Sequence, residues 1–208
     1  MNEFDLKAAG WDQNPMDWDR SAAIVKELLI QVPVRKEMTA LEYGAGTGIT
    51  SFLLKDHFRE ITMMDSSSEM VKIMKEKIKS TNSQNLKPMM FNLEKEEWNG
   101  ENFDLIITQM VLHHVNDLDN IFRKFYEIIN PGGYLAIADL YPEDGSFHGE
   151  GFEGHKGFDT NILADKLREY GFGNIYARKC FVINKKISEN VLREFEVFLL
   201  VAFRGPEI

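Results

Sequence analysis

The chain has 208 residues, and its 24 basic and 33 acidic side chains give a formal net charge of −9 at pH 7. This length predicts a single domain, 1–208, that buries about 70% of the surface of the unfolded chain. A hydrophobic fraction of 44% and a charged fraction of 27% exclude a disordered or collagen-like chain. The one cysteine, Cys180, excludes an internal disulfide and a cysteine-based zinc site, and it is typical of a reducing compartment.

Charge and hydropathy also limit location and partners. No stretch reaches the roughly 18 consecutive apolar residues that a membrane helix needs, so no membrane insertion is expected. Residues 1–10 carry Glu3 and Asp5 and no apolar block, which does not fit a signal peptide. We therefore expect a cytoplasmic protein. The acidic charge disfavours nucleic acid as a partner, because binding to phosphates requires a positive surface. The oligomeric state is not indicated.

The N-terminal part, 1–36, is predicted to be a helical extension in front of an α/β core. Asn14 can cap a helix that Pro33 ends. Further on, Ser66 and Glu69 have the spacing of a capping box and are expected to open another helix. After the extension, the predicted elements up to residue 91 are strand 39–43, helix 48–56, strand 61–64, helix 66–79 and strand 88–91.

The core, 37–208, continues this alternation of strands and helices. The remaining predicted elements are strand 103–108, helix 119–129, strand 134–138, loop 140–158, helix 160–170, and strands 174–183 and 194–204. Alternation of this kind predicts a doubly wound parallel sheet with helices on both faces. A short polar link, 184–190, precedes the last strand and is too short for a parallel crossover. The seven strands should therefore form a mixed sheet whose last strand is antiparallel.

A glycine-rich turn joins the first strand of the core to the next helix. It reads Glu42-Tyr43-Gly44-Ala45-Gly46-Thr47-Gly48 and lies where a parallel sheet binds its ligands. Glycines let the backbone approach a ligand, and a helix N-terminus offers free N–H groups. A dinucleotide fingerprint would need glycine at Ile49, and no phosphate-binding Gly-Lys-Ser/Thr follows. Asp65 ends the second strand, 19 residues after Gly46, and can accept both hydroxyls of a ribose.

With Glu42 in front, the Gly-x-Gly-x-Gly turn resembles the first motif of the class I S-adenosylmethionine-dependent methyltransferases. The similarity extends over roughly residues 38–205, and the opening segment Phe4–Asp12 also looks like that of small-molecule members similar to ubiquinone/menaquinone-biosynthesis enzymes. The later segments that resemble the family, in chain order, are Asp65–Met70, Asn92-Leu93-Glu94, Asn102–Ile107, Gln109–Val115 and Asn130–Leu135. The resemblance implies a Rossmann-like seven-stranded sheet.

The resemblance also implies S-adenosyl-L-methionine as the cofactor and a small organic molecule as the methyl acceptor. It implies that Asp65 binds the ribose and that Met70 packs on the adenine or the ribose. Asn92 stands where the family usually has an acid that meets the adenine amino group, and an amide oxygen can still accept that hydrogen bond. The predicted cofactor-binding residues are Glu42, Gly44, Ala45, Gly46, Gly48, Asp65, Ser66, Met70, Asn92, Leu93, Gln109 and His114.

Three histidines, His113, His148 and His155, are the candidate catalytic residues. His113 follows the fourth strand beside the expected methyl position, and a purely structural role for it stays open. His148 and His155 lie in the loop 140–158, which has five glycines and is expected to face the acceptor, although a solvated surface loop is an alternative. A base is needed only if the acceptor atom carries a proton of high pKa. The spacing of His148, Glu153 and His155 matches no recognised zinc pattern, so no metal site is predicted.

Several functions and side-chain roles remain open from the sequence. The alternatives to a methyltransferase are a non-catalytic S-adenosylmethionine-binding module and, less favoured, a nicotinamide-dependent oxidoreductase. Ile49 and the absence of a Ser/Tyr-x-x-x-Lys pair count against the oxidoreductase. A binding module would need no space for an acceptor beside the methyl group. Trp11 and Trp18 are expected either to close over the cofactor or to pack the N-terminal helix onto the core.

Overall fold

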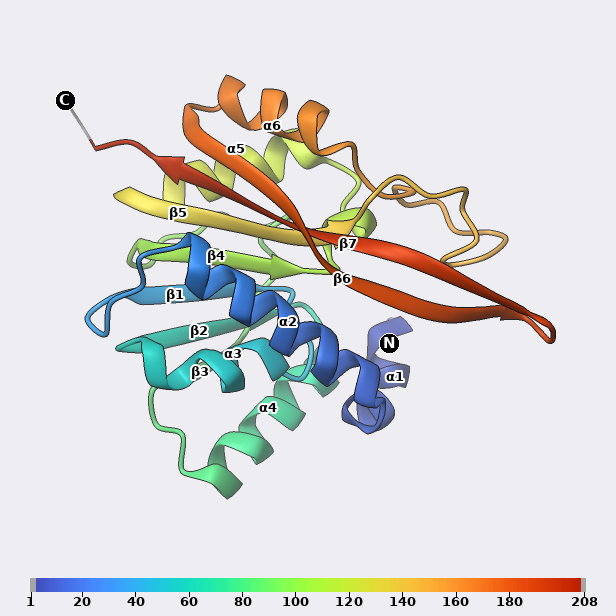
Figure 1. Cartoon of the computed structure of the whole chain (residues 1–208). Coiled ribbons are helices and arrows are strands. Elements are labelled where there is room, and N and C mark those ends of the chain that lie inside the picture. The colour runs from blue at the N-terminus through green and yellow to red at the C-terminus, as the bar shows by residue number, and fades with distance from the viewer. Residues whose placement is uncertain (1–2, 207–208) are drawn as a thin grey trace.

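A mixed sheet of seven strands forms the centre of the structure, a computed structural model that describes residues 3–206. The first two and last two residues of the predicted domain 1–208 lie outside the described residues. The strands have the spatial order β3-β2-β1-β4-β5-β7-β6 (Figure 1), and β7 runs antiparallel to both of its neighbours. Their bounds are β1 Thr39–Tyr43, β2 Glu60–Asp65, β3 Leu86–Met90, β4 Phe103–Gln109, β5 Ile129–Leu140, β6 Phe172–Ser188 and β7 Val191–Arg204. The predicted fold class is confirmed.

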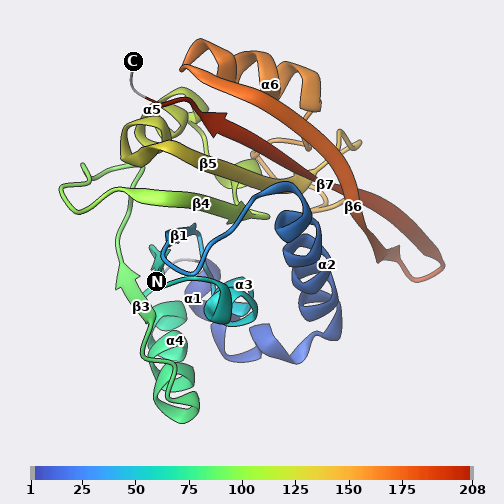
Figure 2. The ribbon, with the colours of Figure 1, turned by 60° about the vertical axis from the view of Figure 1, so that its left-hand side comes forward.

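Helices cover both faces of this sheet. Figure 2 shows α2 and α3 on one side and α5 and α6 on the other. The bounds are α1 Glu3–Lys7, α2 Pro15–Gln31, α3 Ile49–Leu54, α4 Ser68–Thr81, α5 Leu118–Ile128 and α6 Thr160–Glu169, with short 3-10 turns η1 Ala8–Gln13, η2 Lys55–His57 and η3 Leu112–His114. Within residues 3–206, none of the helices has the length and apolarity needed to cross a membrane.

The strands of the parallel part are buried on both faces because each face packs on its own helices. On β1, Ala40 lies in a buried cluster with Leu28 of α2, whereas Leu41 lies in a second cluster with Phe122 of α5. Successive strand side chains point to opposite faces, so one run of apolar residues serves both clusters. This is why the central strands are continuous hydrophobic segments.

The N-cap of the helix after β2 lies one residue later than predicted. Ser67, not Ser66, is the N-cap of α4, and its hydroxyl accepts a hydrogen bond from the N–H of Met70 at 3.2 Å. The N–H of Ser67 is itself held by the carboxylate of Asp65 at 2.8 Å. Ser66 is thereby left in the turn after β2, where it faces the cavity described below.

The last two strands are longer than predicted and leave a turn of only two residues between them. β6 continues to Ser188 and β7 begins at Val191, so the segment 184–190 is mostly strand and not a link. All its side chains except Ile187 are polar or charged, and this part of the hairpin extends beyond the helices (Figure 1). Its backbone pairs with β7 in register from Ile183↔Phe195 to Lys186↔Leu192. The sequence therefore ended β6 too early, at residue 183, and began β7 too late, at residue 194.

Candidate functional site

A cavity opens at the carboxyl ends of β1, β2 and β4, next to the point where the strand order reverses. About 160 Å³ of it is open to the centre of a water-sized molecule, and about 990 Å³ is free of protein atoms when the open mouth is counted. Eleven of the twelve predicted cofactor-binding residues line it: Glu42, Gly44, Ala45, Gly46, Asp65, Ser66, Met70, Asn92, Leu93, Gln109 and His114. Gly48 and the three candidate catalytic histidines are not among its lining residues.

The glycine turn needs its glycines for different reasons. Gly44, Gly46 and Gly48 have φ of +69°, +55° and +84°, a backbone region that L side chains rarely adopt. A Cβ on Gly44 would overlap Val111, and a Cβ on Gly48 would overlap Met63. At Gly46 a Cβ would meet only the indole Nε1 of Trp11, at 3.6 Å. Gly46 is therefore the glycine of the turn that leaves open space beside the backbone inside the cavity.

Asp65 ties the end of β2 to the glycine turn. Its Oδ2 accepts a hydrogen bond from the N–H of Gly46 at 2.7 Å, and its Oδ1 accepts one from Ser67 at 2.8 Å. Burial raises the pKa of this carboxyl, although these N–H groups oppose the shift. Each oxygen has a second lone pair, so the carboxylate can accept two further hydrogen bonds from a ligand in the cavity.

Glu42 is buried at the end of β1 and caps the helix that follows the turn. Its Oε2 accepts hydrogen bonds from the N–H of Ser51, at 3.0 Å, and from the Ser51 hydroxyl. Burial is the main cause that raises the pKa of Glu42 from 4.5 to about 7, and the bonds from Ser51 only partly oppose it. Glu42 thus holds α3 against β1 while its side chain also borders the cavity.

On the other side of β1, a hydrogen-bonded group joins α2 to β4. Gln109 accepts from the hydroxyl of Thr50 at 3.1 Å and donates its amide N–H to the hydroxyl of Ser21 at 2.8 Å. Next to Ser21, Arg20 lines the cavity with a guanidinium that pairs with Asp17 at 2.8 Å. The Nε of Arg20 is buried and has no hydrogen-bond partner among the described residues. The guanidinium thus adds a positive charge to this part of the cavity lining.

The segment after β3 forms the apolar end of the cavity. Phe91 and Leu93 line it together with Asn92, whose amide oxygen accepts a hydrogen bond from the N–H of Glu94 at 3.1 Å. Lys124 of α5 is 3% exposed and fixes this segment, since its ammonium donates to the carbonyl of Leu93 at 2.8 Å. The buried ammonium of Lys124 thus holds this wall of the cavity from the side of α5.

The N-terminal segment lies over the glycine turn. Phe4 and Trp11 line the cavity. Asp5 accepts a hydrogen bond from the Ser67 hydroxyl at 2.6 Å, and Asp12 forms an ion pair with Lys77 of α4 at 2.8 Å. These contacts fasten η1 and α1 to α4, so the helical extension supplies part of the cavity wall.

A histidine cluster stands beside the cavity. His113 is buried, and its Nδ1 lies 2.7 Å from Oδ1 of the fully buried Asp139. The ring of His148 lies 5.0 Å from that of His113 and 5.1 Å from that of His114, and it stacks on Phe152 at 3.9 Å. Partial desolvation, reinforced by His113 and His114, lowers the pKa of His148 to about 4, although much of its side chain is exposed. The cluster therefore presents a neutral imidazole at pH 7.

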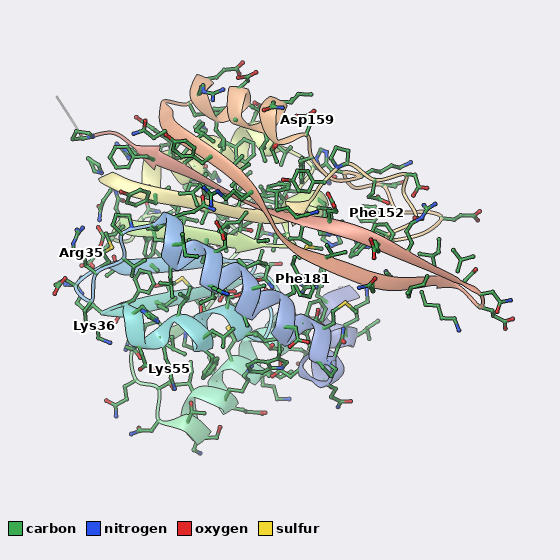
Figure 3. All side chains as sticks on the ribbon, viewed as in Figure 1. Arg35, Lys36, Lys55, Phe152, Asp159 and Phe181 are labelled. Atoms are coloured by element: carbon green, nitrogen blue, oxygen red, sulfur yellow. The ribbon has the colours of Figure 1, made fainter. Side chains whose placement is uncertain are left out.

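His155 does not join this cluster, although its backbone is bonded to it. Its N–H donates to the carbonyl of His113 at 2.8 Å, while its Nε2 lies 2.9 Å from the carbonyl oxygen of Val115. His155 thus fastens the loop after β5 to η3. Figure 3 labels Phe152 in this loop, which lies beside the β6–β7 hairpin.

The sequence matches the methyltransferase-domain family over residues 18–196, which include the glycine turn, the histidine cluster and the cavity lining other than Phe4 and Trp11. The chain belongs to this family. The predicted membership of the class I S-adenosylmethionine-dependent methyltransferases is confirmed, and with it S-adenosylmethionine as the cofactor. The alternative function, a nicotinamide-dependent oxidoreductase, is therefore no longer supported.

Two curated methyltransferases illustrate the relationship. An uncharacterized methyltransferase of Schizosaccharomyces pombe is 26% identical over 153 residues, which are 66% of this chain and 54% of that protein. A demethylmenaquinone methyltransferase of Listeria welshimeri is 26% identical over 117 residues, which are 55% of this chain and 50% of that protein. The chain thus spans about half the length of the curated methyltransferases that it matches.

The fold of a methyltransferase is also seen by comparison with solved structures. A chain of the Haloferax volcanii complex that contains the Trm112 methyltransferase activator superimposes with a TM-score of 0.77 at 18% identity, covering 99% of each chain. At this identity the likeness concerns the fold. It agrees with the strand order found here.

Two charged side chains in the cavity lining of this methyltransferase, Arg20 and Glu94, were not predicted as site residues. Arg20 lies in a helix that the sequence describes only by its amphipathic spacing, so its position over the cavity depends on how α2 packs. Glu94 lines the cavity two residues after Asn92 and is an acid close to where the family usually has one. Arg20 stands two residues after Trp18, about 200° around the helix from the predicted apolar face, so that face gave no signal for it.

Proposed function

We propose that the chain is an enzyme that transfers the methyl group of S-adenosylmethionine to a small organic acceptor. The observation that carries the proposal is a pair of charged groups on opposite sides of β1. Asp65 offers carboxylate oxygens at the end of β2, and Arg20 of α2 places a guanidinium in the cavity lining. A ligand with a ribose diol at one end and a carboxylate at the other complements both.

The remaining lining fits the same ligand. Phe91, Leu93 and Met70 supply an apolar wall for the adenine, and the amide of Asn92 can meet its polar edge. Gly46 lets the backbone approach the ligand without a side chain. When bound, S-adenosylmethionine supplies a methyl group on a positively charged sulfur. Glu42, which borders the cavity, is the acid best placed to balance positive charge there.

The acceptor side of the site is formed by His114, Phe4 and the loop after β5. The main task of these residues is to hold the acceptor atom about 3 Å from the methyl carbon and in line with its bond to sulfur. The leaving group is neutral, so no acid is required. We propose that His113 and His148 act on the acceptor, with Asp139 orienting His113. A role for His155 as a base would require its contact with Val115 to open.

The proposed partners follow from charge and shape. A small acceptor fits a cavity of this kind, whereas an acidic chain is a poor partner for nucleic acid. We also propose a cytoplasmic location, based on the lone Cys180. A non-catalytic S-adenosylmethionine-binding module stays the alternative from another class.

Titration calorimetry with S-adenosylhomocysteine, with NAD as the control, tests the site before the acceptor is known. Micromolar binding of the first and none of the second is expected. Phenols, quinols, carboxylic acids and amines are then screened with S-adenosylmethionine for release of S-adenosylhomocysteine. His148→Ala should slow turnover with an active acceptor more than it weakens cofactor binding. Tight cofactor binding with no turnover across all of these acceptor classes would favour the binding module.

A further inference from the structure

Three histidines from two segments of the chain converge beside the cofactor cavity. His113 and His114 belong to η3 after β4, whereas His148 lies in the loop between β5 and α6. One ring nitrogen of each lies within 4.8 Å of the other two. Within residues 3–206, His113, His114 and His148 are the group of three potential metal ligands that lie this close together.

The first of these histidines is oriented by a buried acid. Oδ1 of Asp139 is 2.7 Å from Nδ1 of His113, and Asp139 is also held by the N–H of Leu140 at 2.8 Å. A carboxylate only accepts hydrogen bonds, so Nδ1 carries the hydrogen and Nε2 keeps its lone pair. Metal-binding histidines are oriented in this way by a carboxylate on the other ring nitrogen.

We propose that His113, His114 and His148 bind a divalent transition-metal ion of the zinc type, with Asp139 as the residue that positions His113. Imidazole nitrogens favour zinc and its neighbours in the first transition row over magnesium or calcium, which prefer oxygen ligands. Three protein ligands leave a coordination position open, as in zinc enzymes.

The cluster needs only a small adjustment to reach coordinating geometry. Zinc–nitrogen bonds of about 2.0–2.1 Å at tetrahedral angles place the ligand nitrogens about 3.4 Å apart. The present limit of 4.8 Å therefore has to shorten by little more than an ångström. His148 is on the glycine-rich loop, where Gly149 follows directly and has no atom within 4 Å of its Cβ position. The backbone that follows His148 is therefore not packed against the core.

The position of the site indicates the class of acceptor, a step that rests on the proposed function. His114 lines the cofactor cavity, so a metal on this cluster would stand at its edge. A metal there fits an acceptor with a phenolic or enolic hydroxyl. The bound hydroxyl would release its proton to water, and the metal would hold the oxygen anion in place. The sequence predicted no metal site because the spacing within the loop gave no sign that His148 meets η3.

Metal binding is measured directly on the full chain without an affinity tag. Calorimetry with Zn²⁺ and visible absorption with Co²⁺ should show one equivalent per chain and tetrahedral cobalt bands. His148→Ala, at an exposed position, should lower the affinity at least tenfold, and Asp139→Asn should lower it by ~10–100-fold. His57→Ala, at an exposed histidine outside the cluster, should keep it. Absence of a site in the unmodified chain, or equal affinity after His148→Ala, would overturn the proposal.

The same samples are titrated with S-adenosylhomocysteine, which separates this inference from the proposed function. Binding of S-adenosylhomocysteine without a metal site leaves the proposed function standing and overturns the metal site. A metal site without S-adenosylhomocysteine binding supports the metal site and overturns the proposed function.

Discussion

Asp65 and Gly46 are joined by a hydrogen bond of 2.7 Å from the backbone N–H of the glycine to Oδ2 of the carboxylate. The contact connects the end of β2 with the turn after β1, two points 19 residues apart in the chain. It fixes the position of the carboxylate relative to Gly46, which has no side chain. Asp65, which the sequence assigns to the ribose, and Gly46, whose backbone is expected to approach the cofactor, thus form one structural unit.

Replacing Asp65 should weaken cofactor binding. Asp65→Ala removes a charged acceptor for the ribose hydroxyls, so the affinity for S-adenosylhomocysteine should fall by roughly 1.5–3 kcal/mol, measured by calorimetry. The variant should also be less stable, because the N–H groups of Gly46 and Ser67 lose their acceptor. Binding is therefore measured well below the melting temperature. Asp56→Ala, at an exposed acid, is the control, and unchanged affinity in Asp65→Ala would contradict the assignment.

A side chain at Gly46 should block the cofactor without unfolding the protein. Gly46→Val should abolish S-adenosylhomocysteine binding because the side chain occupies the open space beside the turn. Its positive φ adds a backbone penalty of about 1–2 kcal/mol. Gly132→Val is the matched control, since Gly132 has φ of +83° and open space around its Cβ position but lies outside the cavity lining. Equal S-adenosylhomocysteine affinities in the two variants would show that the backbone at Gly46 is not approached by the ligand.

Local motifs and long-range packing differ in how well the sequence predicted them. The turn at Gly46 and the acid at Asp65 could be predicted because each depends on a strand end and a few adjacent residues. The capping hydroxyl was misplaced by one residue, since Ser66 and Ser67 are both acceptable caps and the choice depends on the bond from Ser67 to Asp65.

The rest of the site depends on distant segments. Arg20 reaches the cavity only because α2 packs on the face of the sheet that contains Ala40. His148 meets His113 only because the loop after β5 folds back on η3, and no periodicity encodes that path. The strand ends near Ser188 and Val191 were missed because the end of β6 is mostly polar, and because Val191 and Leu192 of β7 are exposed and belong to neither core cluster.

The proposed role of Arg20 can be separated from that of Asp65 with two ligands. S-adenosylhomocysteine has a carboxylate, whereas methylthioadenosine has the same nucleoside without the amino acid. Arg20→Met should lower the affinity for the first by about tenfold or more, as for a lost charged hydrogen bond, and leave the second unchanged. Lys26→Met, at an exposed cation on the same helix, is the control. An equal loss for both ligands would mean that Arg20 acts on the fold and not on the carboxylate.

Glu42 should make the stability of the protein depend on pH in the weakly acidic range. Its pKa is about 7 in the folded chain and 4.5 ordinarily, so between these values the folded state retains a proton that the unfolded state has lost. Its contribution to stability is fully present below pH 4.5 and is lost as pH rises through 7. The expected decrease in the free energy of unfolding is about 3 kcal/mol, from 1.36 kcal/mol per pKa unit.

The comparison of the unmodified chain with Glu42→Gln isolates this effect from the titration of other groups. Urea unfolding of both proteins at several pH values from 4.5 to 7.5 gives the difference between their unfolding free energies. As pH rises, the unmodified chain should lose stability relative to Glu42→Gln, because the glutamine has no proton to lose. If the difference in unfolding free energy stays the same at every pH, it reflects only the altered hydrogen bonds to Ser51. The carboxyl at the end of β1 would then titrate alike in the folded and unfolded chains.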